Sequence, residues 1–179
     1  RKKGIAKAAK RTDREANEGI VVVSTNEDSS EGYIVEINSE TDFVSRNEKF
    51  QNFANEVLNI IKTAKPADLD ALLALPFEES TVKESLENLS GVIGEKLAIK
   101  RFAIVSGGTV AAYSHLGGRM GVLVALDQAD KVDIAMDVAM QVAAANPKYL
   151  VPSEVTAEEL EKEKEIGREL LLKEGKPAE

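Results

Sequence analysis

Two β-branched runs flank a polar segment near the start of the chain, where residues 19–38 read GIVVVST, NEDSSE and GYIVEIN. Consecutive Val, Ile and Thr residues favour extended backbone. Asn, Asp and Ser between two such runs favour a turn. This stretch therefore predicts a β-hairpin, with strands over residues 20–25 and 33–38.

A second hairpin of the same kind is predicted further along the chain. Strand-like runs cover residues 109–114 and 120–126, after another predicted strand at residues 96–106. Glycines stand at matching places in the two hairpins with an offset of 89 residues, and the pairs are Gly19 with Gly108 and Gly32 with Gly121. Duplication of a hairpin-plus-helix unit would explain this offset, and a chance coincidence of glycines remains the alternative.

The order of the predicted elements indicates the fold class. A helical pattern follows each hairpin, from residue 45 to Pro66 and over residues 131–145. Because the strands cluster in hairpins instead of alternating singly with helices, a doubly wound parallel sheet is disfavoured. We predict an α+β fold with two related subdomains, each an antiparallel β-sheet packed with helices.

The helix boundaries are predicted from capping patterns. Ser45 and Glu48 have the spacing of a capping box, which places a helix start at Ser45. Residues 68–91 are expected to form one or two short helices, with Pro76 at a start and Gly91 as the stop. Two further N-caps are predicted, at Thr81 and Thr156. A short basic helix is expected over residues 2–16.

The predicted organisation has four parts. They are a basic helix and linker at residues 1–18, subdomain N at 19–92, subdomain C at 93–155, and a charged helix at 156–179. The chain opens without a methionine and closes soon after a helical pattern. We interpret it as a central piece of a longer protein, with the last helix leading toward a C-terminal module.

The composition limits the class of protein. The chain has 179 residues, 43% hydrophobic and 30% charged, with no cysteine and one histidine. It therefore has neither a disulfide scaffold nor thiolate ligands for zinc. No apolar run has the length of a membrane helix, and no signal peptide is recognisable, so a cytoplasmic location is expected.

Charge is distributed unevenly along the sequence. Residues 1–14 hold seven of the 23 basic side chains, which leaves the other 165 residues with a formal charge of −14. An acidic body repels phosphate backbones, so nucleic acid is not expected as a direct partner. The basic run is interpreted mainly as the solvated face of a helix.

Signs of catalysis are weak. The sequence contains none of the glycine-rich phosphate loops, nucleophile elbows or paired histidines that would indicate an enzyme. His115 stands alone beside a Gly-Gly turn and is more typical of a surface or hydrogen-bonding group than of a catalytic base. We expect no catalytic residue, no cofactor and no metal.

One apolar residue stands in an otherwise polar connection. Phe43 lies between a predicted strand and a predicted helix, and it does not have the position of a hydrophobic staple. Two interpretations remain open from the spacing alone. Phe43 is either a core side chain or an aromatic anchor that enters a partner's pocket.

Four segments together resemble one known family. They are residues 36–46 (EINSETDFVSR), residues 1–9 (RKKGIAKAA), Ile93-Gly94-Glu95, and residues 113–124 (YSHLGGRMGVLV). In order and spacing they are similar to the bacterial elongation factor Ts family, and the resemblance covers essentially the whole chain. The family's N-terminal ubiquitin-associated-like domain and its C-terminal part have no counterpart here, so the chain resembles the central core of the factor.

The resemblance implies a guanine-nucleotide exchange factor for elongation factor Tu, in its GDP-bound and nucleotide-free forms. It implies that Asp42 and Phe43 press near the partner's magnesium and phosphate site. The partner-binding residues implied in the same way are Thr41, Asp42, Phe43, Val44, Ile93, Gly94 and His115. The alternative function is an interaction or dimerisation module with Phe43 in its core. A homodimer through the C-terminal helical region is left open.

Overall fold

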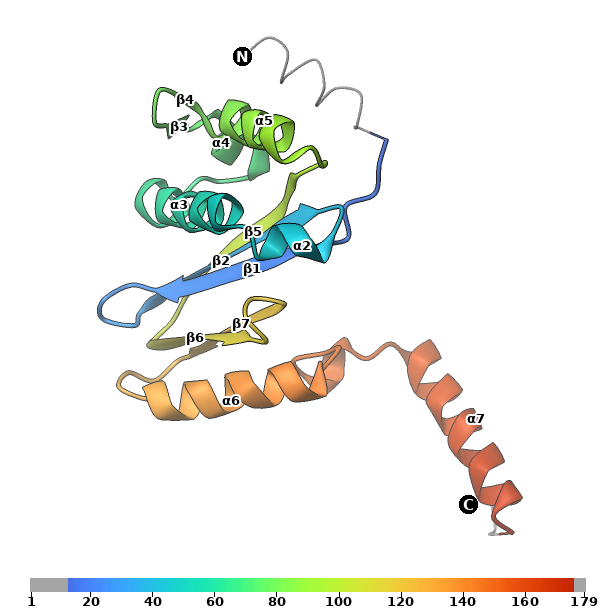
Figure 1. Cartoon of the computed structure of the whole chain (residues 1–179). Helices are drawn as coiled ribbons and strands as arrows, with labels where there is room; N and C mark the ends of the chain where they lie inside the picture. Colours follow the sequence, from blue (N-terminus) through green and yellow to red (C-terminus); the bar gives the residue numbers. More distant parts are fainter. Residues whose placement is uncertain (1–12, 176–179) are drawn as a thin grey trace. The chain divides into compact units, whose positions relative to one another are not determined.

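The computed structural model describes residues 13–175 and contains two compact units, Arg1–Ala144 and Ala145–Glu179 (Figure 1). Most of the helix predicted over residues 2–16 lies outside the described residues. The first unit contains β1 (Glu18–Thr25), β2 (Glu31–Ser39), α2 (Asp42–Ser45), α3 (Glu48–Ala64), α4 (Leu69–Ala74), β3 (Pro76–Phe77), β4 (Ser80–Thr81), α5 (Val82–Ile93), β5 (Ala98–Ser106), β6 (Thr109–His115), β7 (Met120–Leu126) and α6 (Val132–Ala145).

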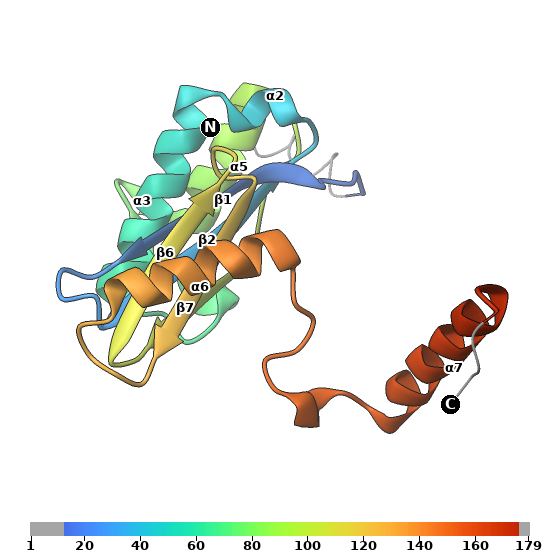
Figure 2. The same ribbon diagram turned by 90° about the horizontal axis from the view of Figure 1, so that it is seen from below.

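The first unit is built in layers. β1, β2 and β5 form an antiparallel sheet in the order β1-β2-β5. Helices α3, α4 and α5 lie on one side of it, and the antiparallel hairpin β6–β7 lies on the other (Figure 1). Helix α6 runs along the face of that hairpin that is turned away from the three-stranded sheet (Figures 1 and 2). The predicted α+β class is confirmed.

The two hairpins have the same strand register at the predicted offset. In the first, Val23 pairs with Ile34, and in the second, Ala112 pairs with Leu123. Each residue of the second pair lies 89 positions after its counterpart. The glycine spacing noted in the sequence therefore reflects two hairpins of matching geometry. The division into subdomains at residues 19–92 and 93–155 stays a prediction, and β5 joins the sheet of the first hairpin.

Contacts between the hairpins follow the same offset. The Val21 amide donates to the Gly118 carbonyl at 2.7 Å, and the Val110 amide donates to the Ser29 carbonyl at 2.6 Å. The first hairpin donates in one bond and the second hairpin donates in the other. This exchange is what a local two-fold axis between the hairpins requires. Each hairpin thus supplies the other with the same backbone contact.

Two glycines allow the hairpins to pack closely. A Cβ at Gly32 would lie 2.6 Å from Val110 Cγ1, and a Cβ at Gly121 would lie 2.6 Å from Val21 Cγ1. Carbon atoms in contact normally lie 3.5–4.0 Å apart, so neither place has room for a methyl group. Glycine is required at both positions by the lack of space and not by the backbone conformation, since neither glycine has a positive φ.

Some predicted boundaries are wrong. Pro76 begins β3 and not a helix, because Asp68 already caps α4 and Leu75, before the proline, is extended. Gly91 does not stop α5, which continues to Ile93 and ends at Gly94 in the left-handed conformation. The capping box at Thr81 is confirmed.

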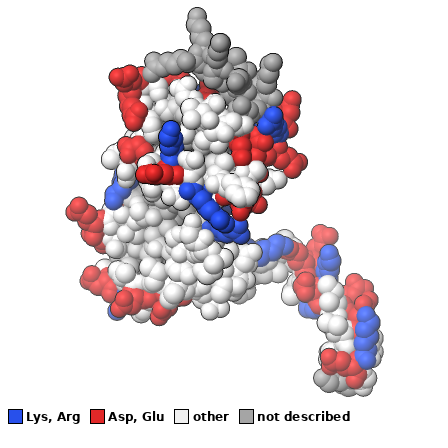
Figure 3. All heavy atoms as spheres, viewed as in Figure 1, with Lys and Arg blue, Asp and Glu red and all other residues white. Residues whose placement is uncertain are grey.

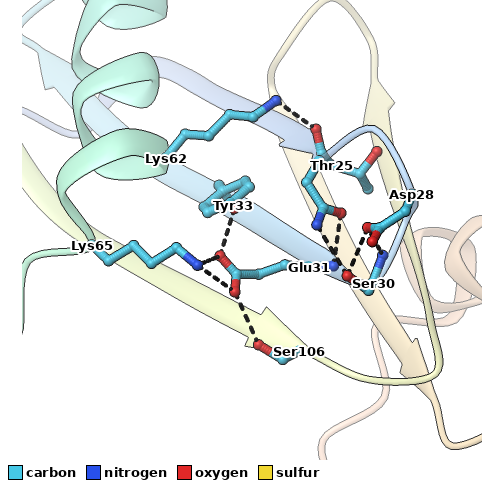
Figure 4. A network of polar contacts seen from close by, with 9 residues as sticks. Thr25, Asp28, Ser30, Glu31, Tyr33, Lys62, Lys65 and Ser106 are labelled. Atoms are coloured by element: carbon cyan, nitrogen blue, oxygen red, sulfur yellow. Dashed lines mark hydrogen bonds and ion pairs between the residues drawn. The ribbon is translucent and has the colours of Figure 1, made fainter.

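A polar network joins the C-terminal end of α3 to the β1–β2 hairpin (Figure 4). Lys65 and the Tyr33 hydroxyl both donate to the Glu31 carboxylate. The Lys65 hydrogen bond, followed by that from Tyr33, lowers the pKa of Glu31. Burial, followed by the bond to Glu31, raises the pKa of Tyr33 to about 12. The network fixes α3 to the sheet at the turn end of the hairpin.

The second unit contains a 3₁₀ turn (Pro152–Glu154) and α7 (Ala157–Lys173). The predicted cap at Thr156 is confirmed, because its side chain accepts from the Glu159 amide. Lys148 and Tyr149 both donate to Glu159, which lowers the pKa of that carboxyl to about 2. Within residues 13–175, no helix is both long and apolar enough to cross a membrane.

Candidate functional site

The segment after β2 forms a single helical turn, α2, that carries Phe43. The Phe43 side chain is 78% exposed, whereas its neighbour Val44 is 5% exposed and belongs to the core. Successive residues of a helix point about 100° apart, so one turn can anchor one residue and present the next. The interpretation of Phe43 as a core residue is therefore wrong for this fold. Val44 anchors the turn from inside.

The helix predicted to begin at Ser45 begins at Glu48. Asn47 is its N-cap, with its side chain accepting from the Lys49 and Phe50 amides at 3.0 and 3.4 Å. Ser45 instead ends α2, and its hydroxyl donates to the Asp42 carbonyl at 2.6 Å. The predicted capping box is wrong because α2 already holds Ser45 in a helical turn, and the extended backbone that an N-cap of α3 needs follows two residues later, at Asn47.

Asp42 lies between two arginines. Its Oδ2 is 3.7 Å from a guanidinium nitrogen of Arg46 and 3.9 Å from one of Arg119. Arg46 follows α2 directly, whereas Arg119 comes from the turn between β6 and β7. The carboxylate therefore links α2 to the second hairpin, although partly exposed ion pairs of this kind are weak.

Thr41 connects α2 to the turn after α5. Its amide donates to Glu95 Oε2 at 2.9 Å, and its hydroxyl donates to Glu95 Oε1 at 2.6 Å. The same turn contains Gly94, where a Cβ would meet nothing within 4 Å. Val92 is 70% exposed, whereas the predicted Ile93 is partly buried against the core. Two of the predicted segments, residues 41–44 and 93–94, are thus neighbours in space.

His115 ends β6. Its Nδ1 lies 2.8 Å from the Tyr113 hydroxyl, and the two rings are tilted against each other. The adjacent Leu116 is 70% exposed on a turn whose residues 116–118 all have positive φ. This turn is connected to α2 through Arg119 and to β1 through Gly118. No group of three potential metal ligands occurs among residues 13–175.

Sequence reasoning missed several residues that shape this site: Glu40, Val92, Glu95, Leu116 and Arg119. All of them except Val92 lie inside segments that carry the family resemblance, but nothing local in the sequence indicates their contacts. The face seen in Figure 3 has broad uncharged areas, interrupted near the middle by a few basic and acidic side chains.

Comparison with known proteins identifies the family. The sequence model of the family described as Elongation factor TS matches residues 40–179. The chain belongs to the elongation factor Ts family. Elongation factor Ts from Syntrophotalea carbinolica is 47% identical over 186 residues, covering 99% of this chain and 61% of the relative. The chain thus spans less than two thirds of that relative's length. The predicted partner-binding residues stay a prediction for this member of the elongation factor Ts family.

Proposed function

We propose that this chain promotes release of GDP from elongation factor Tu during translation elongation. The observation that carries the proposal is the exposed Phe43 on a turn held from below by the buried Val44. An exposed aromatic residue on a fixed turn suits an interface anchor, because a few large side chains, aromatic ones prominent among them, carry most of the binding energy of protein–protein interfaces. Membership of the elongation factor Ts family supports the identity of the partner.

The proposed mechanism is thermodynamic linkage. If Phe43 is buried in the partner only when the nucleotide has left, the factor stabilises the nucleotide-free state. Burying one phenylalanine contributes about 1.5–3 kcal/mol. By reciprocity, the bound factor weakens nucleotide binding by the same free energy, which is about 10- to 150-fold. No covalent bond is made or broken in this reaction.

The other predicted residues extend the contact. Asp42 brings a carboxylate next to Phe43, in the region that would approach the partner's magnesium and phosphate site. Ile93 and Gly94 lie beside α2 and offer a second contact, where the open surface at Gly94 admits close approach. His115 and its turn would meet another domain of the partner. The reaction takes place in the cytoplasm on this proposal, and neither nucleic acid nor a membrane takes part.

The test measures release of a fluorescent GDP analogue from elongation factor Tu by stopped flow. We expect acceleration by the chain and at least a tenfold smaller effect from Phe43→Ala. Leu150→Ala is the matched control, because Leu150 is 90% exposed in the other unit and should keep the acceleration. Circular dichroism should show the same fold in all three proteins. Absence of acceleration by the unchanged chain, or equal acceleration by Phe43→Ala, would refute the proposal.

A further inference from the structure

Two glutamates exchange contacts between the segment before α2 and the turn after α5. Glu95 accepts two hydrogen bonds from Thr41, at 2.9 Å from its amide and 2.6 Å from its hydroxyl. In the other direction, Glu40 Oε1 accepts from the Lys96 amide at 2.6 Å. Each of the segments 40–41 and 95–96 therefore supplies a carboxylate that accepts hydrogen bonds from the other segment. We call this set of contacts the Thr41–Glu95 latch.

Both sides of the latch are fixed by buried serines. Ser39 is fully buried, and its hydroxyl donates to the Thr41 carbonyl at 2.9 Å. Ser90 is 5% exposed, and its hydroxyl donates to the Glu95 carbonyl at 2.5 Å. Thr41 thus uses its amide, hydroxyl and carbonyl inside the protein. This geometry gives Thr41 a structural connection to Glu95, and the direct partner contact predicted for it stays a prediction.

The latch contacts α2, a helix that is too short to be stable alone. A helix of four residues gains too few hydrogen bonds to offset the entropy of nucleation. Thr41 is the N-cap of α2, yet its side chain makes no capping bond within that helix. The hydroxyl donates outward to Glu95 instead. The orientation of Phe43 therefore depends on contacts outside α2, chiefly Val44 in the core and the latch at the N-terminal end, with the weaker Asp42–Arg119 ion pair beside them.

We propose that Glu95 is a positioning residue that holds the Phe43 turn in its binding orientation and joins it to the Gly94 turn as one surface. This inference rests on the proposed exchange function. Charged hydrogen bonds are stronger than neutral ones, and the half-buried setting of Glu95 and Thr41 limits competition from water. Without the latch, α2 samples other orientations around Val44. The partner then meets a competent site for only part of the time.

A positioning role and a direct contact can be distinguished by comparing the half-maximal concentration with the maximal rate of GDP release. With Glu95→Ala, the concentration giving half-maximal GDP release should rise about tenfold if the competent fraction falls to about a tenth. The maximal rate should stay near that of the unchanged chain, because Phe43 is still present. Glu95→Gln should restore most of the affinity, since its oxygen can accept from the Thr41 amide and its NH₂ can donate to the hydroxyl. Glu56→Ala, an exposed glutamate on α3, is the control.

A second measurement does not depend on exchange activity. Amide hydrogen exchange by NMR should become faster at Arg46 and Asn47, whose amides bond back to α2, while Phe53 in α3 stays protected. Faster exchange throughout α3 would indicate general loosening and would overturn the positioning role. So would unchanged exchange at Arg46 and Asn47, an unchanged half-maximal concentration, or failure of Glu95→Gln to recover affinity. If the unchanged chain does not accelerate release at all, the proposed function fails, and the amide exchange alone decides the role of Glu95.

Discussion

Gly121→Ala tests the close packing of the two hairpins. The added methyl would lie 2.6 Å from Val21 Cγ1 and 2.7 Å from Val23 Cγ1. Both distances are about 1 Å shorter than a comfortable carbon contact. Valine side chains are stiff about χ1, so neither neighbour can rotate away easily. Relief requires the hairpins to move apart, against the backbone bonds between them.

The expected loss follows from two opposing contributions. Overpacking of this kind costs about 1–3 kcal/mol. Removal of a glycine from a strand returns about 0.5–1 kcal/mol by reducing the freedom of the unfolded chain. With the middle of each range, Gly121→Ala should therefore lower the free energy of unfolding by roughly 1 kcal/mol, and by up to about 2.5 kcal/mol where the hairpins cannot move apart. At Gly167 in α7 nothing lies within 4 Å of an added Cβ, so the same change there should stabilise the helix by about 1 kcal/mol.

Urea unfolding followed by circular dichroism measures the loss for Gly121→Ala, and hydrogen exchange within α7 measures the gain for Gly167→Ala. Val21→Ala removes one of the two clashing methyl groups. The double variant Val21→Ala with Gly121→Ala should therefore be more stable than the sum of the single effects predicts, by at least about 0.5 kcal/mol. A neutral or stabilising Gly121→Ala, or strict additivity with Val21→Ala, would refute the packing argument.

Three further predictions concern stability. Phe43→Ala should change the urea midpoint little, whereas Phe50→Ala should cost about 3–5 kcal/mol because Phe50 is fully buried. Comparable losses in the two variants would contradict the exposure of Phe43. The raised pKa of Tyr33 means that its neutral form stabilises the fold fully below pH 10 and that this stabilisation is lost as the pH rises toward 12. The stability difference between the unchanged chain and Tyr33→Phe should accordingly shrink between pH 9 and 11.5 in urea titrations, and a constant difference would count against it. Thr81→Ala should lose about 1 kcal/mol of the stability of α5 through loss of the capping box, and unaltered amide exchange in the first turn of α5 would exclude this.

Features that depend on neighbouring residues were predictable from the sequence. The β-branched runs and polar turn gave the β1–β2 hairpin, and the Thr81 capping box was correct because both partners lie within four residues. The predicted cap at Ser45 was wrong because the local pattern allows more than one N-cap. Two residues of adjacent segments, Ser45 and Asn47, both suit an N-cap, and only the presence of α2 selects between them.

Features that depend on distant residues were not predictable. The pairing of β5 with β2 joins strands that are separated in the sequence by four helices, α2 to α5, and no local pattern indicates that partner. Exposure of Phe43 follows from where Val44 packs, which is decided by the core as a whole. The bonds between Thr41 and Glu95 cross 54 positions of sequence, so the latch became visible only in the folded chain.

The late arrival of β5 has a consequence for the chain as it is synthesised. β2 has been synthesised once Ser39 is added, but the strand that pairs with its second edge, β5, is complete only at Ser106. At typical synthesis rates of 5–20 residues per second, the intervening stretch takes roughly 3–13 s to emerge. Throughout that interval a growing chain carries an unpaired strand edge, the feature by which nascent proteins associate wrongly. The length of this exposure depends on the rate of synthesis, and the stability of the finished fold does not shorten it.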